Sequence, residues 1–215
     1  MKKIKSLSEE KLNEISALVG ESFWEYPYEY GEGGLRSLIP SRQAMDDYMK
    51  ALIIAGIESG TFYSTNGGEG YILLTDSYGN HPKFTSIMKM MINIKKALGG
   101  WGKFSEFMKT ASSGSETLEQ SMKKQKRNFV KVEMLIVTRD YQGKGYMRKL
   151  MNFAYLTAYR KNCSLILDTD AKSKCDRYIH LGMKLERIRQ SAGFPIYDLI
   201  REASDIKIKN KSINK

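Results

Sequence analysis

The sequence is poor in cysteine and histidine. It contains two cysteines, Cys163 and Cys175, and two histidines among 215 residues. Two cysteines do not make a disulfide framework, and a zinc or iron site needs more sulfur and imidazole ligands than these. We therefore expect no metal, and we interpret the cysteines as small apolar side chains in a reduced compartment.

Long apolar runs are also missing. No stretch approaches the roughly 20 apolar residues that span a membrane. The basic segment 1–5 leads into an amphipathic segment rather than a signal-peptide core. We expect a cytoplasmic protein without a membrane partner. The hydrophobic share of 41% and the charged share of 27% are typical of a globular chain with one sizeable core.

Acidic residues are too few to balance the basic ones, and the net charge is +11. Part of the excess lies at 123–127 and part in a basic C-terminal tail, 205–215. Such runs can bind nucleic acid, but these lack the interleaved aromatic residues that stack on bases. We favour solvent-exposed charges over a nucleic-acid site. A positive protein also attracts a cofactor with several phosphates.

The apolar pattern predicts alternating helices and strands. Helices are expected at 6–19, 41–57, 83–98, 101–110, 116–124, 144–161 and 174–181, and strands at 61–65, 70–75, 130–137, 164–168, 184–189 and 196–200. Ser8 and Ser41 are candidate N-caps. The order strand, helix, strand after residue 130 indicates an α/β fold with a parallel pair at its centre. We see no repeat and no strong boundary, and we expect one domain over 1–204.

The most informative segment joins an apolar strand to a helix through two glycines. It reads Gln142-Gly143-Lys144-Gly145-Tyr146-Met147. A glycine turn at a helix N-terminus offers unpaired N–H groups to a phosphate, and Lys144 and Arg148 add positive charge. The spacing fits neither the Walker loop nor the full dinucleotide fingerprint. Taken alone, the segment fits an ordinary tight turn equally well.

A second motif lies beyond the next strand. Leu167-Asp168-Thr169 ends that strand, and Tyr178 follows on a short helix that ends at Gly182. Together the two motifs resemble the GCN5-related N-acetyltransferases, the GNAT superfamily, which has Gln/Arg-x-x-Gly-x-Gly/Ala at the loop and a Tyr four residues before Gly-Phe. The similarity is greatest to the puromycin-acetyltransferase-like branch, which has a Phe-x-x-x-Pro element, like Phe23 to Pro27, and a helical insertion, here about 83–124.

The resemblance implies a fold and an activity. The fold is a central mixed, mostly antiparallel twisted sheet, with a parallel pair that splays at the cofactor cleft and helices that flank it. The activity is transfer of acetyl from acetyl-CoA to a primary amine of a small molecule. The alternative is a module of the same fold that binds or senses acyl-CoA without turnover. A homodimer is left open.

The resemblance also implies roles for residues. The main chain of Leu135, Ile136 and Val137 would pair with the pantetheine, and the loop 142–147 with Arg148 would hold the pyrophosphate. Tyr178 would protonate the departing thiolate, which suits a phenol within hydrogen-bond reach. The chain departs from the family at Met147, which replaces Gly/Ala. It also departs at Lys174, which replaces a frequent Asn. Lys174 would meet a CoA phosphate or mark a changed use of its position.

Glu133 is our candidate for the group that takes the proton of the attacking amine. It is the only carboxylate on the central strand, and alternation predicts that it shares a face with Leu135 and Val137. Burial on that face would make it a better base. Deprotonation through water is an equally compatible alternative.

The acceptor site is less defined by the sequence. Its candidate walls are the methionine-rich segment 87–91 and an aromatic loop, 23–30, which includes Phe23, Trp24 and Tyr26. Both segments fit a role in the core equally well.

Charged residues extend this hypothesis. Asp168 is expected to shape the acceptor site. Glu25, Glu29 and Glu32 would attract a cationic amine or be solvated loop charges. His180 is expected to point away from the site.

Overall fold

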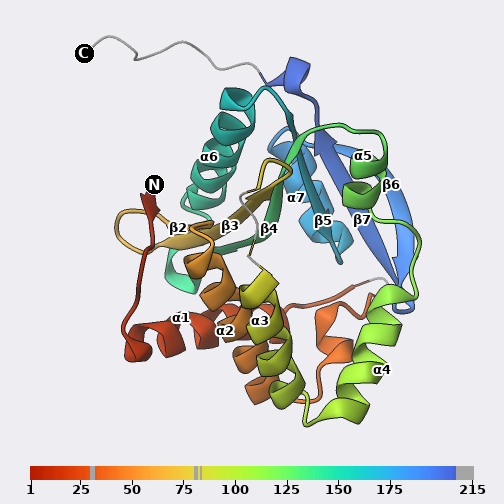
Figure 1. Ribbon diagram of the computed structural model, residues 1–215. Coiled ribbons are helices and arrows are strands. Elements are labelled where there is room, and N and C mark those ends of the chain that lie inside the picture. Colours follow the sequence, from red (N-terminus) through yellow and green to blue (C-terminus); the bar gives the residue numbers. More distant parts are fainter. Residues whose placement is uncertain (30–31, 80–81, 83, 207–215) are drawn as a thin grey trace.

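The computed structural model describes residues 1–29, 32–79, 82 and 84–206 (Figure 1). A seven-stranded sheet runs through it in the order β1-β2-β3-β4-β5-β7-β6. The strands are β1 (Lys2–Lys3), β2 (Phe62–Ser64), β3 (Gly70–Asp76), β4 (Phe129–Val137), β5 (Ser164–Thr169), β6 (Lys184–Ser191) and β7 (Phe194–Arg201). Neighbours are antiparallel except for the parallel pair β4 and β5. The mixed, mostly antiparallel sheet is confirmed.

Helices cover both faces of the sheet. One face carries α1 (Glu9–Trp24), α2 (Arg42–Glu58), α3 (Phe84–Ala97), α4 (Trp101–Ser112) and α5 (Leu118–Lys124). The opposite face carries α6 (Tyr146–Arg160) and α7 (Lys172–His180). In Figure 1, α1 to α4 gather at one end of the sheet. The predicted helical insertion between β3 and β4 is therefore α3, α4 and α5.

Local signals explain where the first two long helices begin. The Ser8 hydroxyl accepts from the Lys11 N–H at 3.2 Å, and the Ser41 hydroxyl accepts from the Ala44 N–H at 3.2 Å. The end of α1 differs from the prediction, because the helix continues through Phe23 and Trp24. Both aromatic side chains pack against the core of the α1–α5 face. That packing keeps the last turn helical.

Strand β4 contains the irregularity that shapes the site. Leu73 of β3 pairs with Met134, and Leu74 pairs with Val132, so Glu133 is an extra residue in a β-bulge. The parallel ladder between β4 and β5 ends at Val132 and Leu167. Beyond that pair the strands part, and no described strand pairs with the β5-facing edge of β4.

The packed part of the chain runs further than expected. Ile206 is buried against the core of the α6/α7 face, two residues beyond the predicted limit of 204. The rest of the predicted basic tail, 207–215, lies outside the described residues. Cys163 and Cys175 are free and buried. Every helix in the described part of the chain is too short or too polar to cross a membrane.

Candidate functional site

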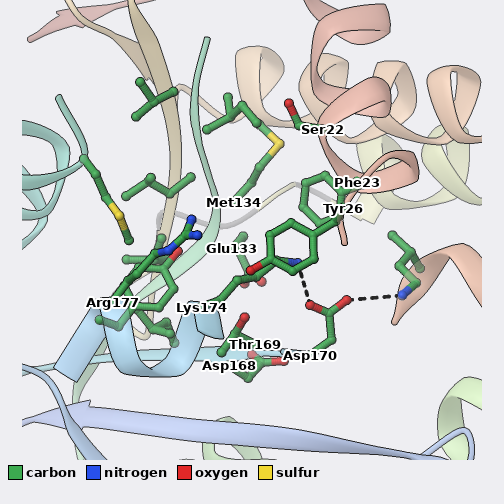
Figure 2. A pocket seen from close by; sticks show the side chains of 18 of the residues that line it. Ser22, Phe23, Tyr26, Glu133, Met134, Asp168, Thr169, Asp170, Lys174 and Arg177 are labelled. Carbon is green, nitrogen blue, oxygen red and sulfur yellow. Dashed lines mark hydrogen bonds and ion pairs between the residues drawn. The ribbon is translucent and has the colours of Figure 1, made fainter. Parts of the chain in front are cut away.

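A cavity of about 1070 Å³ opens where β4 and β5 part (Figure 2). Elements from both faces of the sheet line it. Most residues that the sequence nominated are among its walls: Phe23, Tyr26, Glu133, Leu135, Ile136, Val137, Gln142, Gly143, Gly145, Tyr146, Met147, Arg148, Asp168, Lys174 and Tyr178. Lys144 instead lines a small adjoining pocket with Tyr141 and Lys149.

The glycine turn has the geometry of an anion cradle. Gly143 and Gly145 have φ angles of +73° and +80°, where a side chain is strained, and a Cβ on either would meet nothing within 4 Å. No side chain caps α6, which begins after Gly145. The N–H groups of its first turn are thus available to a ligand. The open edge of β4 and this turn together leave backbone groups on one wall of the cavity available to a ligand.

Side chains around the turn are already partly engaged. The Gln142 amide donates to the Val137 carbonyl at 3.3 Å. The Arg148 guanidinium lies 3.5 Å from the Nε2 atom of His180. His180 is exposed, as expected, but it lines the cavity beside Arg148, so the expectation that it points away is wrong. The reason is its place at the end of α7, where the helix reaches the cavity rim.

Tyr178 lies on α7 with its ring against the core of the α6/α7 face. Its hydroxyl makes no hydrogen bond within the described residues. Burial raises the pKa of Tyr178, and the charge of Asp170 raises it further. The phenol therefore keeps its proton at neutral pH while it lines the cavity.

The predicted surroundings of Glu133 are wrong. Its carboxylate accepts from the Thr75 hydroxyl at 2.8 Å and pairs with Lys131 at 2.9 Å, and its side chain is 31% exposed. Thr75 and Lys131 lie on the α1–α5 face, whereas Leu135 and Val137 pack on the other face. The bulge at Glu133 breaks the alternation of side chains. The charge of Glu133 also acts on Tyr48 of α2. Burial is the main cause that raises the pKa of Tyr48 to about 12, and the negative charge of Glu133 is the second cause.

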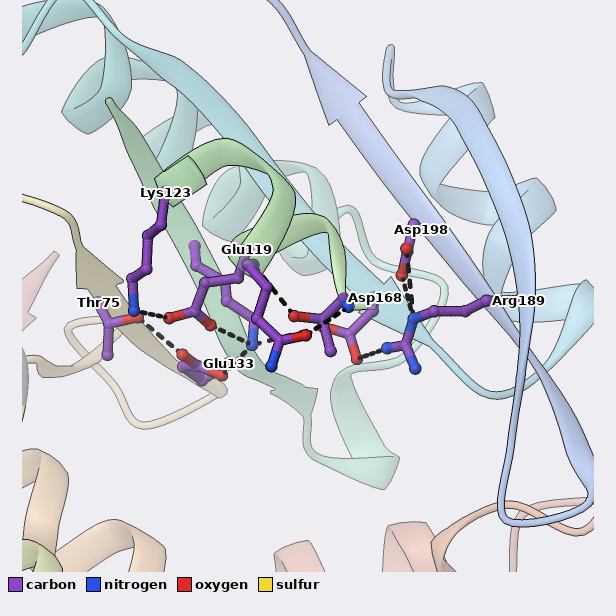
Figure 3. Close-up of polar contacts among 10 residues, drawn as sticks. Thr75, Glu119, Lys123, Glu133, Asp168, Arg189 and Asp198 are labelled. Carbon is purple, nitrogen blue, oxygen red and sulfur yellow. Dashed lines mark hydrogen bonds and ion pairs between the residues drawn. The ribbon is translucent and has the colours of Figure 1, made fainter. Parts of the chain in front are cut away.

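Lys131 is a residue that the sequence analysis missed. Its ammonium lies 2.9 Å from Glu133, 3.2 Å from Glu119 and 3.5 Å from Asp168. Figure 3 shows these three carboxylates gathered at the end of the β4–β5 ladder. Burial alone would lower the pKa of Lys131, but the three carboxylates raise it above its ordinary value. The available signal was a lysine two residues before the only carboxylate of a strand.

Asp168 joins this network from β5. Its second oxygen pairs with Arg189 at 3.4 Å, and Arg189 also pairs with the fully buried Asp198 at 3.0 Å. Glu133 and Asp168 thus lie on the two strands that part, next to the end of their ladder and on the α1–α5 face. Both line the cavity, with Tyr48 nearby.

The aromatic loop forms a separate part of the wall. The Lys174 ammonium pairs with Asp170 at 2.7 Å and lies 3.9 Å from the centre of the Tyr26 ring. These contacts favour a changed use of position 174, and its contact with a CoA phosphate stays a prediction. Trp24 is not among the cavity-lining residues, and it packs against the core.

The acidic residues of this loop do not act as a group. Glu32 is buried at 7% exposure, accepts from the Lys172 N–H and accepts from the Tyr197 hydroxyl at 3.2 Å. Glu32 therefore binds the first N–H group of α7. It is neither a solvated charge nor a group that attracts the amine. Glu25 and Glu29 are exposed.

The basic run 123–127 is largely paired. Lys123 binds Glu119 at 2.6 Å, Lys124 binds Glu116 at 2.8 Å, and Arg127 binds both oxygens of Glu202 at 2.7 Å. These ion pairs support the interpretation as a solvent-exposed face. Across the described residues, no group of three or more His, Cys, Asp or Glu could hold a metal ion.

Comparisons with known proteins agree with this geometry. The sequence matches the Acetyltransferase (GNAT) family over residues 71–178, half of the chain. An N-acetyltransferase from Staphylococcus aureus Mu50 has the same fold, with 14% identity, a TM-score of 0.54, and coverage of 89% of this chain and 96% of that one. A Drosophila melanogaster polyamine N-acetyltransferase, which forms N-acetylagmatine, has 11% identity, a TM-score of 0.53, and coverage of 92% and 98%.

These structural similarities establish the fold. No curated protein matches the sequence. The similarity to the puromycin-acetyltransferase-like branch stays a prediction. The family match over residues 71–178, together with the splayed sheet and its glycine turn, shows that the chain belongs to the GNAT acetyltransferase family.

Proposed function

We propose that the protein transfers the acetyl group of acetyl-CoA to the primary amine of a small molecule. One observation carries the proposal. A single cavity contains the open edge of β4, the glycine turn at the start of α6, and the Tyr178 phenol. The strand edge would pair with the amides of the pantetheine, the glycine turn would bind the pyrophosphate, and the phenol would donate a proton.

The donor would lie along the parting strands. Its pantetheine amides would pair with the main chain of Leu135, Ile136 and Val137, in the manner of an added strand. Its pyrophosphate would meet the N–H groups around Gly143 and Gly145, with Arg148 as a charged partner. This placement directs the thioester toward the end of the β4–β5 ladder.

Several proton transfers accompany the reaction. Glu133 or water takes the proton of the ammonium, so that the amine is neutral. The amine then attacks the thioester carbonyl carbon, the carbon–sulfur bond breaks, and Tyr178 gives its proton to the departing thiolate. The new amide nitrogen loses its surplus proton to solvent, and Tyr178 regains a proton from solvent. The balance is one amide and one thiol from one amine and one thioester.

The acceptor would approach from the α1–α5 face. That side of the cavity has Glu133 and Asp168 next to the parting strands, with Tyr48 and Phe194 as apolar surface. Lone pairs of Glu133 already bind Thr75 and Lys131, so a water relay remains an alternative to direct proton abstraction. The apolar area favours a small amine with a hydrocarbon or aromatic part.

Two measurements test the proposal. Acetyl-CoA at about 100 times its Kd should stabilise the protein by about 2.7 kcal/mol, equivalent to a Tm increase of roughly 5–10 °C for a chain of this size. An amine panel followed by CoA release should then identify acceptors. A protein that acetyl-CoA does not stabilise would contradict the donor assignment. Stabilisation without CoA release on any amine would favour the non-catalytic module.

A further inference from the structure

The cavity wall contains a cation that the proposed reaction does not use. The Lys174 ammonium lies 3.9 Å from the ring centre of Tyr26, 5.1 Å from that of Tyr28 and 5.3 Å from that of Phe23. Its charge is also 2.7 Å from Asp170. Figure 2 shows Lys174 between the aromatic residues and this carboxylate. We call Phe23, Tyr26, Tyr28 and Asp170 the ammonium cage.

The cage is held together by contacts that do not involve Lys174. One oxygen of Asp170 accepts from the Tyr28 hydroxyl at 2.6 Å and from the Leu35 N–H at 3.2 Å. The Tyr26 hydroxyl shares a hydrogen bond of 2.6 Å with the Ser173 hydroxyl. The carboxylate and two of the rings would therefore keep their places if the lysine side chain were removed.

The chemistry of the cage suits a cation such as an ammonium. Aromatic faces within about 6 Å attract a cation, and the attraction is stronger when water is excluded. The Asp170 side chain is only 13% exposed. Burial alone would raise the pKa of Asp170, but Lys174, Tyr28 and the Leu35 N–H hold it below its ordinary value. With Lys174 in place, the cage thus carries a negative charge at neutral pH.

We propose that the ammonium cage is a specificity element of the acceptor site and that Lys174 is its built-in occupant. Phe23, Tyr26, Asp170 and Lys174 all line the same cavity as Glu133 and Tyr178. While Lys174 fills the cage, an acceptor with a second ammonium meets a like charge at this wall. Acceptors with an uncharged tail are favoured instead. The part of this proposal that concerns acceptors rests on the proposed function.

Removal of the lysine side chain should convert the cage into a site for a primary alkylammonium. We expect propylammonium to raise the Tm of Lys174→Ala and to leave the wild type unchanged. Propanol, which has a similar shape but no charge, should stabilise neither protein. Lys174→Ala/Asp170→Asn should lose the effect, because the carboxylate is gone. Equal effects of propylammonium on Lys174→Ala and the wild type would overturn the proposal.

The test remains decisive if Lys174→Ala folds poorly. A ligand that binds only the native state increases the folded fraction. Refolding of Lys174→Ala with and without propylammonium then gives the same readout. A higher yield with propylammonium than with propanol supports the cage, and equal yields overturn it.

Acceptor choice tests the role in specificity. The ratio of kcat/KM for diaminobutane to that for butylamine should rise about tenfold in Lys174→Ala relative to the wild type, equivalent to about 1.4 kcal/mol. An unchanged ratio in an active variant would overturn this role. If neither protein transfers acetyl to any amine, the proposed function fails. The propylammonium measurement still decides whether the cage binds an ammonium.

Discussion

The ammonium of Lys131 lies 2.9 Å from the carboxylate of Glu133, on the strand segment where β4 and β5 separate. The same ammonium reaches Asp168 on β5 at 3.5 Å. Lys131 pairs with Ile166 inside the ladder, and its ammonium links the two carboxylates that lie just beyond the last paired residues. Lys131 does not line the cavity itself, but it pairs with Glu133 and Asp168, which do.

Lys131→Met should be destabilising because it leaves three carboxylates without their shared cation. Removal of one partner of a buried pair costs about 3–5 kcal/mol. Glu133 and Asp168 are about a third exposed, so we expect about 2 kcal/mol. Urea unfolding at pH 7 measures this cost.

The cost should depend on pH with a definite sign. Burial opposes ionisation of Glu119, yet Lys131 and Lys123 hold its pKa below the ordinary value. The resulting stability is present above the unfolded-state pKa of about 4.3 and is lost as pH falls through the lowered folded-state pKa. The difference in unfolding free energy between wild type and Lys131→Met should therefore shrink as pH falls below about 4. Lys123→Met is the control, because Lys123 is exposed and should cost about 0.5 kcal/mol or less. Equal costs for the two lysines would contradict the network.

Tyr178→Phe should lower kcat by about 100-fold or more and change the KM for acetyl-CoA little, because the phenol acts on the leaving group. Burial raises the pKa of Tyr178, so the proton-bearing form persists and kcat should not decline up to about pH 10. Steady-state kinetics over this range measure both effects. Tyr63→Phe is the control, since Tyr63 packs on Phe153 away from the cavity. Similar kcat values for the two variants would remove Tyr178 from the reaction.

Glu133→Gln distinguishes the two routes for the amine proton. If Glu133 takes this proton, kcat at pH 7 should fall by about 100-fold, and the loss should shrink as pH rises and more of the amine is neutral. A loss of less than about threefold at every pH would assign the proton to water. The pH profile of kcat gives the answer.

Gly145→Ala should weaken acetyl-CoA binding. The φ angle of +80° places an L residue in the left-handed region at a cost of about 1–2 kcal/mol, and relief of that strain would rotate the first N–H groups of α6. Titration calorimetry should show a roughly tenfold higher Kd. Gly102→Ala is the matched control, because Gly102 lies in the first turn of α4 with open space around it and should leave the Kd unchanged. Unchanged affinity in Gly145→Ala would argue against the cradle.

Glu32→Ala should weaken the attachment of the segment that follows the aromatic loop to the start of α7. The buried carboxylate accepts from the Lys172 N–H and the Tyr197 hydroxyl, and its loss leaves both donors without a partner. We expect about 1–3 kcal/mol of destabilisation in urea unfolding. The exposed Glu29 gives the control Glu29→Ala, which should have little effect. Equal stability of the two variants would show that Glu32 does not anchor the loop.

Much of the fold was predictable because its signals are local. The serine caps at Ser8 and Ser41, the glycine turn at Gly143 and Gly145, and the order of strands and helices all appear where the pattern indicates. The two-residue strand β1 was missed, since two lysines have no strand signal of their own. It forms by pairing with β2.

The sequence by itself determined the family, the glycine turn at the start of α6 and Tyr178 as a cavity residue, because these depend on short-range spacing along the chain. Only the tertiary structure decided which face Glu133 occupies and which groups surround Lys174. A bulge set by pairing with β3 moved Glu133 to the α1–α5 face. Lys174 pairs with Asp170 four residues before it, and aromatic rings from a distant segment surround its ammonium. Strand register and the approach of these rings depend on contacts between residues far apart in the sequence, and no local pattern encodes them.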